Sequence, residues 1–435
     1  MHGRVLAVLA SACVFVQGGL GLSIPGRQSA AVVKRAGIPP SEDPWYTAPD
    51  GYESASPGTV LRNRTATGLP TVAGSNCSAA YQLLYRTTAS QGNATFAVTT
   101  VFVPSTDPVD ALLSYQIPYD SAYINASPSY SLYGGVYQDI KVALGKGYFV
   151  TVPDYEGPLA SFTAGHMSGY ATLDAIRATL NAADLYGMSS DPLYAMWGYS
   201  GGALATEWAA ELQLDYASEL SFAGAAMGGL TPNVTSVLLS INEKVSAGLA
   251  PPAIIGLTSQ WPESQDYVFS KLVKTKTGTY TAANFLAAEN MTVSEAESTY
   301  TFQDITQYFV DGLDDITGDE VMTAINGDGI MGLSGGVPQM PVYAYKAVKD
   351  EISQVEDTDA LVDKYCGMGA NILYQRNRIG GHSAEATNGD PAATAWLDAV
   401  LTGTYAKSYN TTGCTIQTVV QGTDASPLRT LVMPR

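Results

Sequence analysis

Residues 193–212 join a short apolar run, a glycine-rich pentapeptide and a helix-forming run, in that order. Residues 193–197 (LYAMW) are apolar and aromatic, as in a buried strand. Residues 198–202 read G-Y-S-G-G, and residues 203–212 contain good helix formers and no glycine or proline. A serine in G-x-S-x-G between a strand and a helix is the pattern of a nucleophile elbow, in which a sharp turn exposes the hydroxyl. The pattern predicts that Ser200 links a strand to a helix.

The same pattern occurs again at residues 332–336 (G-L-S-G-G). The chain has 43 glycines in 435 residues, so chance matches are expected. The second copy follows N-G-D-G and precedes Val337-Pro338, which predicts loop on both sides. Ser200 is therefore the candidate nucleophile.

Strand-like and helix-like segments alternate on both sides of Ser200. Strands are expected over residues 98–103, 111–117, 147–152, 193–197, 221–227, 341–345 and 371–376, and helices over 136–145, 172–185 and 203–212. This alternation is typical of a mostly parallel sheet with helices on both faces.

The alternation breaks between residues 230 and 334. Helical pieces interrupted by glycine and proline occur there, without a convincing strand. We interpret residues 230–334 as a helical cap (lid) insertion over the active edge of the sheet. The core, residues 36–229 and 335–435, is expected to have an α/β-hydrolase fold.

The N-terminus resembles a secretory leader. Residues 1–22 contain one arginine followed by an apolar stretch with small residues, which predicts a signal peptide. Residues 23–35 end at Lys34-Arg35, which indicates a pro-peptide; a chance basic pair is an equally good interpretation. We expect a secreted, extracellular protein.

Charge and hydropathy exclude some partners. The chain has 22 Lys and Arg residues against 40 Asp and Glu residues, a net charge of −18, which repels nucleic acid. No apolar run after the leader approaches the ~20 residues of a membrane span, so no integral span is expected. Sequons for N-glycosylation occur at Asn63, Asn76, Asn93, Asn125, Asn233, Asn290 and Asn410.

The cysteines indicate one disulfide. Cys13 lies in the leader, which leaves Cys77, Cys366 and Cys414. Three thiols in an oxidising compartment give one disulfide and one free thiol. We pair Cys366 with Cys414, which flank the C-terminal segment. The scattered cysteines and the few histidines show no zinc spacing, and we expect no metal or cofactor.

A serine nucleophile needs a base, and histidine is the usual one. The three histidines are His2 in the leader, His166 and His382. In the α/β-hydrolase fold the triad order is Ser, then Asp or Glu, then His, which only His382 satisfies. His166 is therefore interpreted as structural.

The acid should lie between Ser200 and His382, just after a strand. Asp350 follows the strand expected at residues 341–345 and is our candidate. The alternatives are Asp328, Asp357 and Asp359, together with Glu351 beside the candidate.

The oxyanion of a tetrahedral intermediate needs two donors. One is the backbone N–H of Gly201, the residue after the nucleophile. The other is expected in the loop of residues 118–121 (P-Y-D-S), which lacks the H-G-G-G form of many esterases.

These pieces resemble the fungal secretory lipases, the group that includes Candida antarctica lipase A. The likeness extends from residue 43 to the C-terminus. The matching stretches are residues 43–46, 58–62, 81–87, 152–158, 173–178, 198–202, 349–351 and 381–382.

The resemblance implies an α/β-hydrolase core with a helical lid and a triad of Ser200, Asp350 and His382. It also implies that the backbone of Asp120 supplies the second oxyanion donor and that the Cys366–Cys414 disulfide is retained. Where family members often carry a cysteine before Pro128, this chain has Ala126-Ser127.

We therefore expect a secreted carboxylic-ester hydrolase that forms an acyl-enzyme, namely a triacylglycerol lipase acting at a lipid–water interface. One alternative is an esterase or deacetylase for a small secondary-metabolite ester. Another is a catalytically dead hydrolase-fold binding protein.

Overall fold

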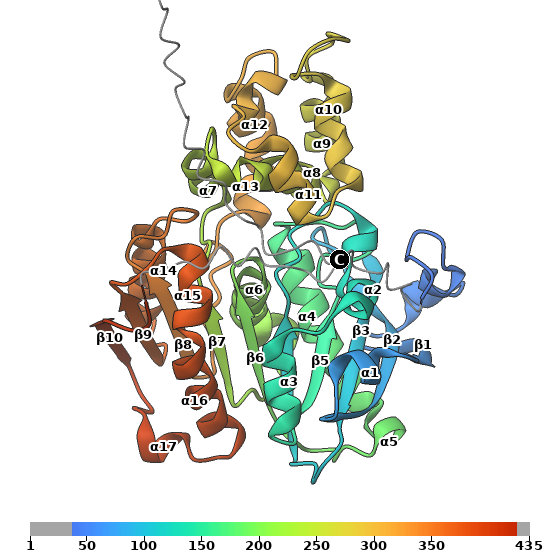
Figure 1. Ribbon diagram of the computed structural model, residues 1–435, viewed down its shortest axis with the longest axis vertical. Helices are drawn as coiled ribbons and strands as arrows, with labels where there is room; N and C mark the ends of the chain where they lie inside the picture. The colour runs from blue at the N-terminus through green and yellow to red at the C-terminus, as the bar shows by residue number, and fades with distance from the viewer. Residues whose placement is uncertain (1–36, 424–435) are drawn as a thin grey trace, which may run out of the picture. The chain divides into compact units, whose positions relative to one another are not determined.

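The computed structural model describes residues 37–423. The predicted signal peptide and pro-peptide lie outside them. In the described part, one sheet has the strand order β1-β2-β3-β5-β4-β6-β7-β8-β9-β10 (Figure 1). The strands are β1 (Val60–Thr65), β2 (Cys77–Thr88), β3 (Ala94–Pro104), β4 (Ala111–Gln116), β5 (Phe149–Pro153), β6 (Leu193–Tyr199), β7 (Gly224–Gly228), β8 (Val342–Ala347), β9 (Ile372–Asn377) and β10 (Cys414–Val419).

The sheet is mostly parallel, as predicted. Neighbouring strands from β5 across to β10 pair in parallel, whereas β1, β2, β3 and β5 pair antiparallel. The strands β1, β2 and β10 were not predicted from apolar patterns. Buried polar residues such as Gln82 and Thr87 interrupt the pattern in β2, and β10 is largely exposed at the sheet edge.

Helices cover both faces of the sheet, which confirms the predicted α/β-hydrolase architecture. In Figure 1, α3 and α16 lie in front of the strands, and α4 and α6 lie behind them. The core helices are α1 (Leu69–Ala73), α2 (Pro128–Ser131), α3 (Gln138–Gly145), α4 (Gly165–Asn181), α5 (Ala183–Tyr186), α6 (Gly201–Tyr216), α14 (Val355–Gly367), α15 (His382–Asn388), α16 (Asp390–Leu401) and α17 (Tyr405–Ser408).

Helix α4 begins at Gly165, earlier than the predicted start at residue 172, and ends before a separate short helix, α5. Its first turn packs on α6 at Trp208. A Cβ on Gly165 would lie 2.0 Å from Cε2 of Trp208, so only glycine allows this close approach. The contact depends on the tertiary structure, which the local helix pattern does not contain.

The segment between β7 and β8 is helical and lies at the carboxyl ends of the parallel strands (Figure 1). Its α-helices are α7 (Val234–Ile241), α8 (Ala250–Ser259), α9 (Pro262–Ser270), α10 (Ala282–Leu286), α11 (Val293–Tyr300), α12 (Asp314–Thr317) and α13 (Asp319–Asp328). Their buried side chains form an apolar cluster separate from that of the sheet, joined from the core by Ile352. We call these residues, 230–334, the cap.

The second G-x-S-x-G copy is a loop, as predicted, and anchors the end of the cap. The backbone N–H groups of Gly332 and Ser334 donate to the Glu211 carboxylate at 2.7 and 3.1 Å. The Ser334 hydroxyl also donates to Glu211. Ser334 therefore binds a side chain of α6 and lies outside the Ser200 site.

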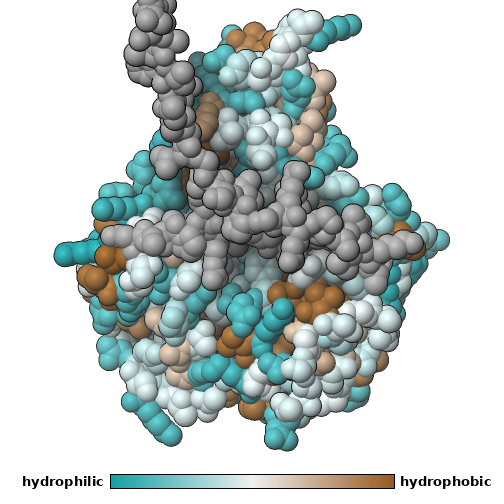
Figure 2. All heavy atoms as spheres, in the orientation of Figure 1, coloured by the Kyte–Doolittle hydropathy of each residue, from teal (hydrophilic) through white to brown (hydrophobic). Residues whose placement is uncertain are grey.

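One face of the molecule mixes hydrophilic and apolar residues (Figure 2). Apart from the grey atoms, the face in Figure 2 is a mosaic of teal and pale residues with separate brown patches. Among residues 37–423, no helix has both the length and the apolar character that a membrane span requires.

Five of the sequon asparagines are exposed: Asn63, Asn76, Asn93, Asn290 and Asn410. Asn233 is half-buried, and its side-chain oxygen caps α7. Asn125 does not fit the prediction, because it is buried and its Nδ2 donates to Ser41 Oγ and Tyr123 OH at 2.9 and 2.8 Å. A glycan would need that nitrogen. Glycosylation at the other six sequons remains a prediction.

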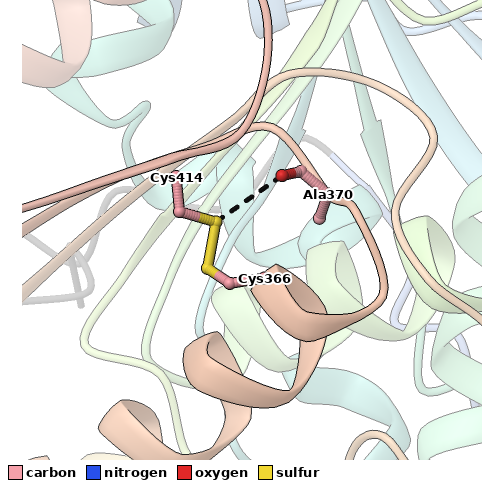
Figure 3. Close-up of a disulfide and its surroundings, with 3 residues drawn as sticks. All are labelled: Cys366, Ala370 and Cys414. Carbon is pink, nitrogen blue, oxygen red and sulfur yellow. Dashed lines mark hydrogen bonds between the residues drawn. A yellow bond between two sulfur atoms is a disulfide. The ribbon is translucent and has the colours of Figure 1, made fainter.

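The predicted Cys366–Cys414 disulfide is present and joins the end of α14 to the start of β10 (Figure 3). The two Cα atoms lie 5.9 Å apart. Cys77 is buried and free. The disulfide closes a loop across 48 residues and fastens an exposed edge strand.

We expect Cys366→Ser to lower the free energy of unfolding by about 3–4 kcal/mol, because the unfolded chain regains loop entropy. Thermal unfolding with and without a reducing agent measures this. The reducing agent should lower the Tm of the wild type and leave that of Cys366→Ser unchanged. Equal Tm values for wild type and variant would contradict a stabilising role.

Candidate active site

Ser200 occupies the turn between β6 and α6. Its backbone has φ 53° and ψ −120°, which residues other than glycine rarely adopt. A Cβ on Gly198 would lie 2.1 Å from the carbonyl oxygen of Gly202, and a Cβ on Gly202 would lie 2.0 Å from that of Gln116. The two glycines are therefore required for a bend that presents the serine hydroxyl.

His382 begins α15 and faces this hydroxyl. Its Nε2 lies 2.9 Å from Ser200 Oγ, and its Nδ1 lies 2.7 Å from Oδ2 of Asp350. Asp350 follows β8 and His382 follows β9, so both lie at the carboxyl ends of parallel strands, as Ser200 does. The structure thus brings together the three residues that the sequence singled out.

The Asp350 carboxylate is buried and saturated with partners. Its Oδ1 accepts from the N–H groups of Ile352 and Ser353, both at 2.9 Å, and its Oδ2 lies 3.1 Å from Nζ of Lys346. Burial alone would raise the pKa of Asp350, but the charges of His382 and Lys346 and these hydrogen bonds hold that pKa below its usual value. The carboxylate is therefore ionised at neutral pH.

Three of the alternative acids lie near this arrangement without facing the imidazole. Glu351 accepts from the backbone N–H of His382 at 2.8 Å, so it holds the start of α15. Asp359 pairs with Arg376 at 2.8 Å, and Asp357 lies with Asp359 on α14.

His166 has a separate environment. Its Nδ1 lies 3.1 Å from Oδ1 of Asp328, and its ring centroid lies 4.8 Å from that of Trp208. Trp261 donates to the other oxygen of Asp328 at 2.7 Å. These contacts join α4 to the cap. His166 therefore faces Asp328, whereas His382 faces Ser200.

The loop after β4 lies directly over Gly201. A Cβ on Gly201 would be only 1.9 Å from Oδ1 of Asp120, so the Asp120 carboxyl group packs on the residue after Ser200. Asp120 has φ 45°, a strained value for this residue type. Its neighbour Ser121 donates to the carbonyl of Met291 in the cap at 2.7 Å. The loop therefore contacts both Gly201 and the cap.

The Asp120 carboxyl group is mostly protonated below neutral pH. Burial raises its pKa to about 7; the charge of Glu297 on α11 raises it and that of His382 lowers it. Burial also raises the pKa of Glu297. The charge of a cap residue, Glu297, thus contributes to the raised pKa of Asp120 in the core.

An apolar pocket that is partly open to solvent is lined by Ser200, Gly201 and Asp120. It continues into the cap, and the core contributes Phe162 and Leu204 to its wall. The cap side is lined mainly by aliphatic side chains, among them Val237, Leu238, Ile241, Ile254, Leu257 and Ile325.

Sequence reasoning missed Lys346 and Glu297. A signal was available for Lys346, because a lysine interrupts the otherwise uncharged run VYAYKA of a buried strand. No local signal marks Glu297, since only the packing of α11 against the core places it near Asp120.

The strand–serine–helix turn, the imidazole and carboxylate aligned with it, and the helix-covered parallel sheet define an α/β-hydrolase. Among residues 37–423, no group of three His, Cys, Asp or Glu side chains could hold a metal ion.

The chain belongs to the secretory lipase family, whose model matches residues 137–408. It is 47% identical over 406 residues to the trichothecene C-3 esterase of Fusarium sporotrichioides, covering 90% of each chain. It is 39% identical to lipase A of Arthroderma benhamiae, covering 85% of this chain and 81% of that one. The solved structure of Candida antarctica lipase A in its closed state is similar, with a TM-score of 0.79 and 27% identity over 92% of this chain and 94% of that one. These findings confirm the resemblance and show that the chain is a carboxylic-ester hydrolase.

Several other buried carboxyl groups have raised pKa values. Burial raises the pKa of Asp154 and Glu385 to about 7, as it does for Asp120. It raises the pKa of Glu156 and Glu207 well above the usual value. These groups bind protons more tightly in the folded chain than in the unfolded chain. Their contribution to stability is fully present below about pH 4, and the part that comes from Asp120, Asp154 and Glu385 is lost as the pH rises through about 7.

We therefore expect the Tm to fall when the pH is raised from about 5 to about 8. Asp120→Asn should reduce this fall by about 2–5 °C, because an amide does not titrate. Oδ1 of Asp120 has no hydrogen-bond partner among the described residues, so the amide displaces none there. Calorimetry across this pH range provides the measurement.

The exposed Asp191 offers a matched control, and Asp191→Asn should keep the wild-type pH dependence. A wild-type Tm that rises over this range, or an unchanged slope in Asp120→Asn, would contradict the prediction.

Proposed function

We propose that this chain is a secreted triacylglycerol lipase in which Ser200 is the nucleophile, His382 the base and Asp350 the acid that orients the base. The observation that carries this proposal is the Ser200–His382–Asp350 chain at 2.9 and 2.7 Å, with Ser200 in the lining of an apolar pocket. Family membership and the predicted leader support secretion.

In the proposed reaction, Ser200 Oγ attacks the ester carbonyl carbon while its proton moves to Nε2 of His382. The backbone N–H groups of Gly201 and Asp120 donate to the resulting oxyanion. Collapse of the intermediate breaks the bond to the alcohol oxygen, which takes the proton from His382. Water, deprotonated by His382, then attacks the acyl-enzyme and releases the fatty acid and Ser200.

The pocket supports an acyl chain as the substrate group. Its wall is mostly aliphatic, which favours binding of a hydrocarbon tail whose carbonyl lies at Ser200. Most of the aliphatic wall comes from the cap, so a cap displaced at a lipid–water interface would open the route for a long acyl chain.

A second candidate substrate follows from the relatives. The trichothecene C-3 esterase is 47% identical over 90% of this chain, higher than the 39% of lipase A. An esterase or deacetylase for a secondary-metabolite ester would use the same chemistry with a short acyl group. A dead binding protein would not react, whereas we expect Ser200 to be labelled by a fluorophosphonate probe.

We expect His382→Ala to lower kcat/KM by about 10³–10⁶-fold, because His166, the other imidazole among residues 37–423, is paired with Asp328. His166→Ala is the matched control; it should lower the Tm while kcat/KM stays within about tenfold of the wild type. Hydrolysis of a p-nitrophenyl ester measures both. Equal losses in the two variants would contradict the assigned base.

The substrate class can be tested with p-nitrophenyl acetate, octanoate and palmitate and with emulsified triolein. A lipase should prefer the longer chains, and Leu238→Trp should reduce their hydrolysis by at least about tenfold while sparing acetate, because it fills the pocket. Leu239→Trp, at the adjacent and 57% exposed position of α7, should have little effect. A preference for acetate with no hydrolysis of triolein would reject the lipase and favour the esterase.

A further inference from the structure

A buried lysine touches the Asp350 carboxylate and has no role in the mechanism above. Nζ of Lys346 lies 3.1 Å from Oδ2 of Asp350, the same oxygen that His382 Nδ1 approaches at 2.7 Å. Neither the Lys346 nor the Asp350 side chain is exposed to solvent. A buried cation is costly unless it is paired, so its place beside the candidate catalytic acid calls for a physical explanation.

Lys346 also contacts the start of the cap. Its Nζ donates to the carbonyl of Leu230 at 2.7 Å, just after β7. Burial lowers the pKa of Lys346, and the charges of Asp350, Asp357 and Asp359 oppose this shift. Two acceptors and three carboxylates therefore favour an ammonium group at this position.

The titratable groups around His382 and Asp350 are mainly acidic. Besides Lys346, they are Glu351 beside the acid, Asp357 and Asp359 on α14, Arg376 on β9, Glu385 on α15, Tyr199 on β6, Tyr374 on β9, Asp120 after β4 and Glu297 on α11. Arg376 is paired with Asp359, whereas Lys346 lies directly against Asp350.

An ammonium group at this position has two effects. It keeps Asp350 ionised, so that the carboxylate continues to orient the imidazole. It also offsets part of the negative charge that would stabilise a protonated imidazole. Loss of this offset should therefore move the acid limb of ester hydrolysis to higher pH.

We propose that Lys346 is a positioning residue that holds Asp350 ionised and extends ester hydrolysis into mildly acidic solution. This inference rests on the proposed triad, because it acts through Asp350 and His382.

The test is the pH profile of kcat/KM, normalised to the sites labelled by a fluorophosphonate. Lys346→Gln removes the charge and keeps an amide donor for Asp350 or Leu230. We expect the midpoint of its acid limb to move up by about one pH unit, the size expected for one charge at this range. Lys346→Arg, which keeps the charge, should restore a midpoint close to that of the wild type.

Lys146→Gln is the matched control. Lys146 follows α3 and pairs with Asp398 at 2.5 Å, at the end of the sheet away from Ser200, and its loss should leave the midpoint unchanged. A lower kcat in Lys346→Gln with an unmoved midpoint would mean that the lysine only supports packing, and would overturn the proposal.

If Lys346→Gln does not fold, the wild type alone decides. It should keep at least half of its maximal kcat/KM at about pH 6, and a wild type that has lost more than half of it there would overturn the proposal. A wild type that neither reacts with the fluorophosphonate nor hydrolyses esters would instead reject the triad, so the two failures are distinguishable.

Discussion

The site depends on the strained backbone at Ser200. A residue other than glycine in this conformation costs of the order of 1–3 kcal/mol, which must be offset by the packing around it. The N–H of Ser200 donates to the carbonyl of Gly228 in β7 at 2.9 Å, and Gly202 lies against the end of β4. Strands on both sides of β6 therefore hold the bend. The sheet thus fixes Ser200, the proposed nucleophile, and the loops after β8 and β9 bring Asp350 and His382 to it.

The cap is tied to the same elements that carry the site. Its first residue, Leu230, is bound by Lys346 from β8, and its last turn, at Gly332 and Ser334, is bound by Glu211 from α6. Both contacts are hydrogen bonds between a buried charged side chain and backbone groups, and hydrogen bonds are directional. The wall of the apolar pocket comes mostly from the cap. These contacts therefore hold that wall in a fixed position relative to Ser200.

The local patterns of the sequence predicted the parallel part of the fold and the elbow. Buried parallel strands are short apolar runs, which can be recognised in the sequence without knowing which strands they pair with. They failed for β2, where polar residues are buried, and for the start of α4, which depends on contact with Trp208. The chain order of Ser200, Asp350 and His382 selected the proposed base, since only one histidine satisfied it. Position along the chain favoured Asp350 as the acid but did not exclude Glu351. In the structure, Oδ2 of Asp350 contacts the imidazole of His382, whereas Glu351 accepts from the backbone N–H of His382.

The sequence by itself determined the chemistry that we propose: a serine on a glycine-bounded turn, a downstream histidine and an aspartate between them, within a strand–helix alternation that allows one class of fold. The tertiary structure alone decided the surroundings of those groups, including the cation on Asp350, the carboxyl pair of Asp120 and Glu297, and the aliphatic wall beside Ser200. The reason is physical. Backbone conformation and strand pattern depend on neighbours along the chain, whereas charge, burial and cavity shape depend on residues that come together only after folding.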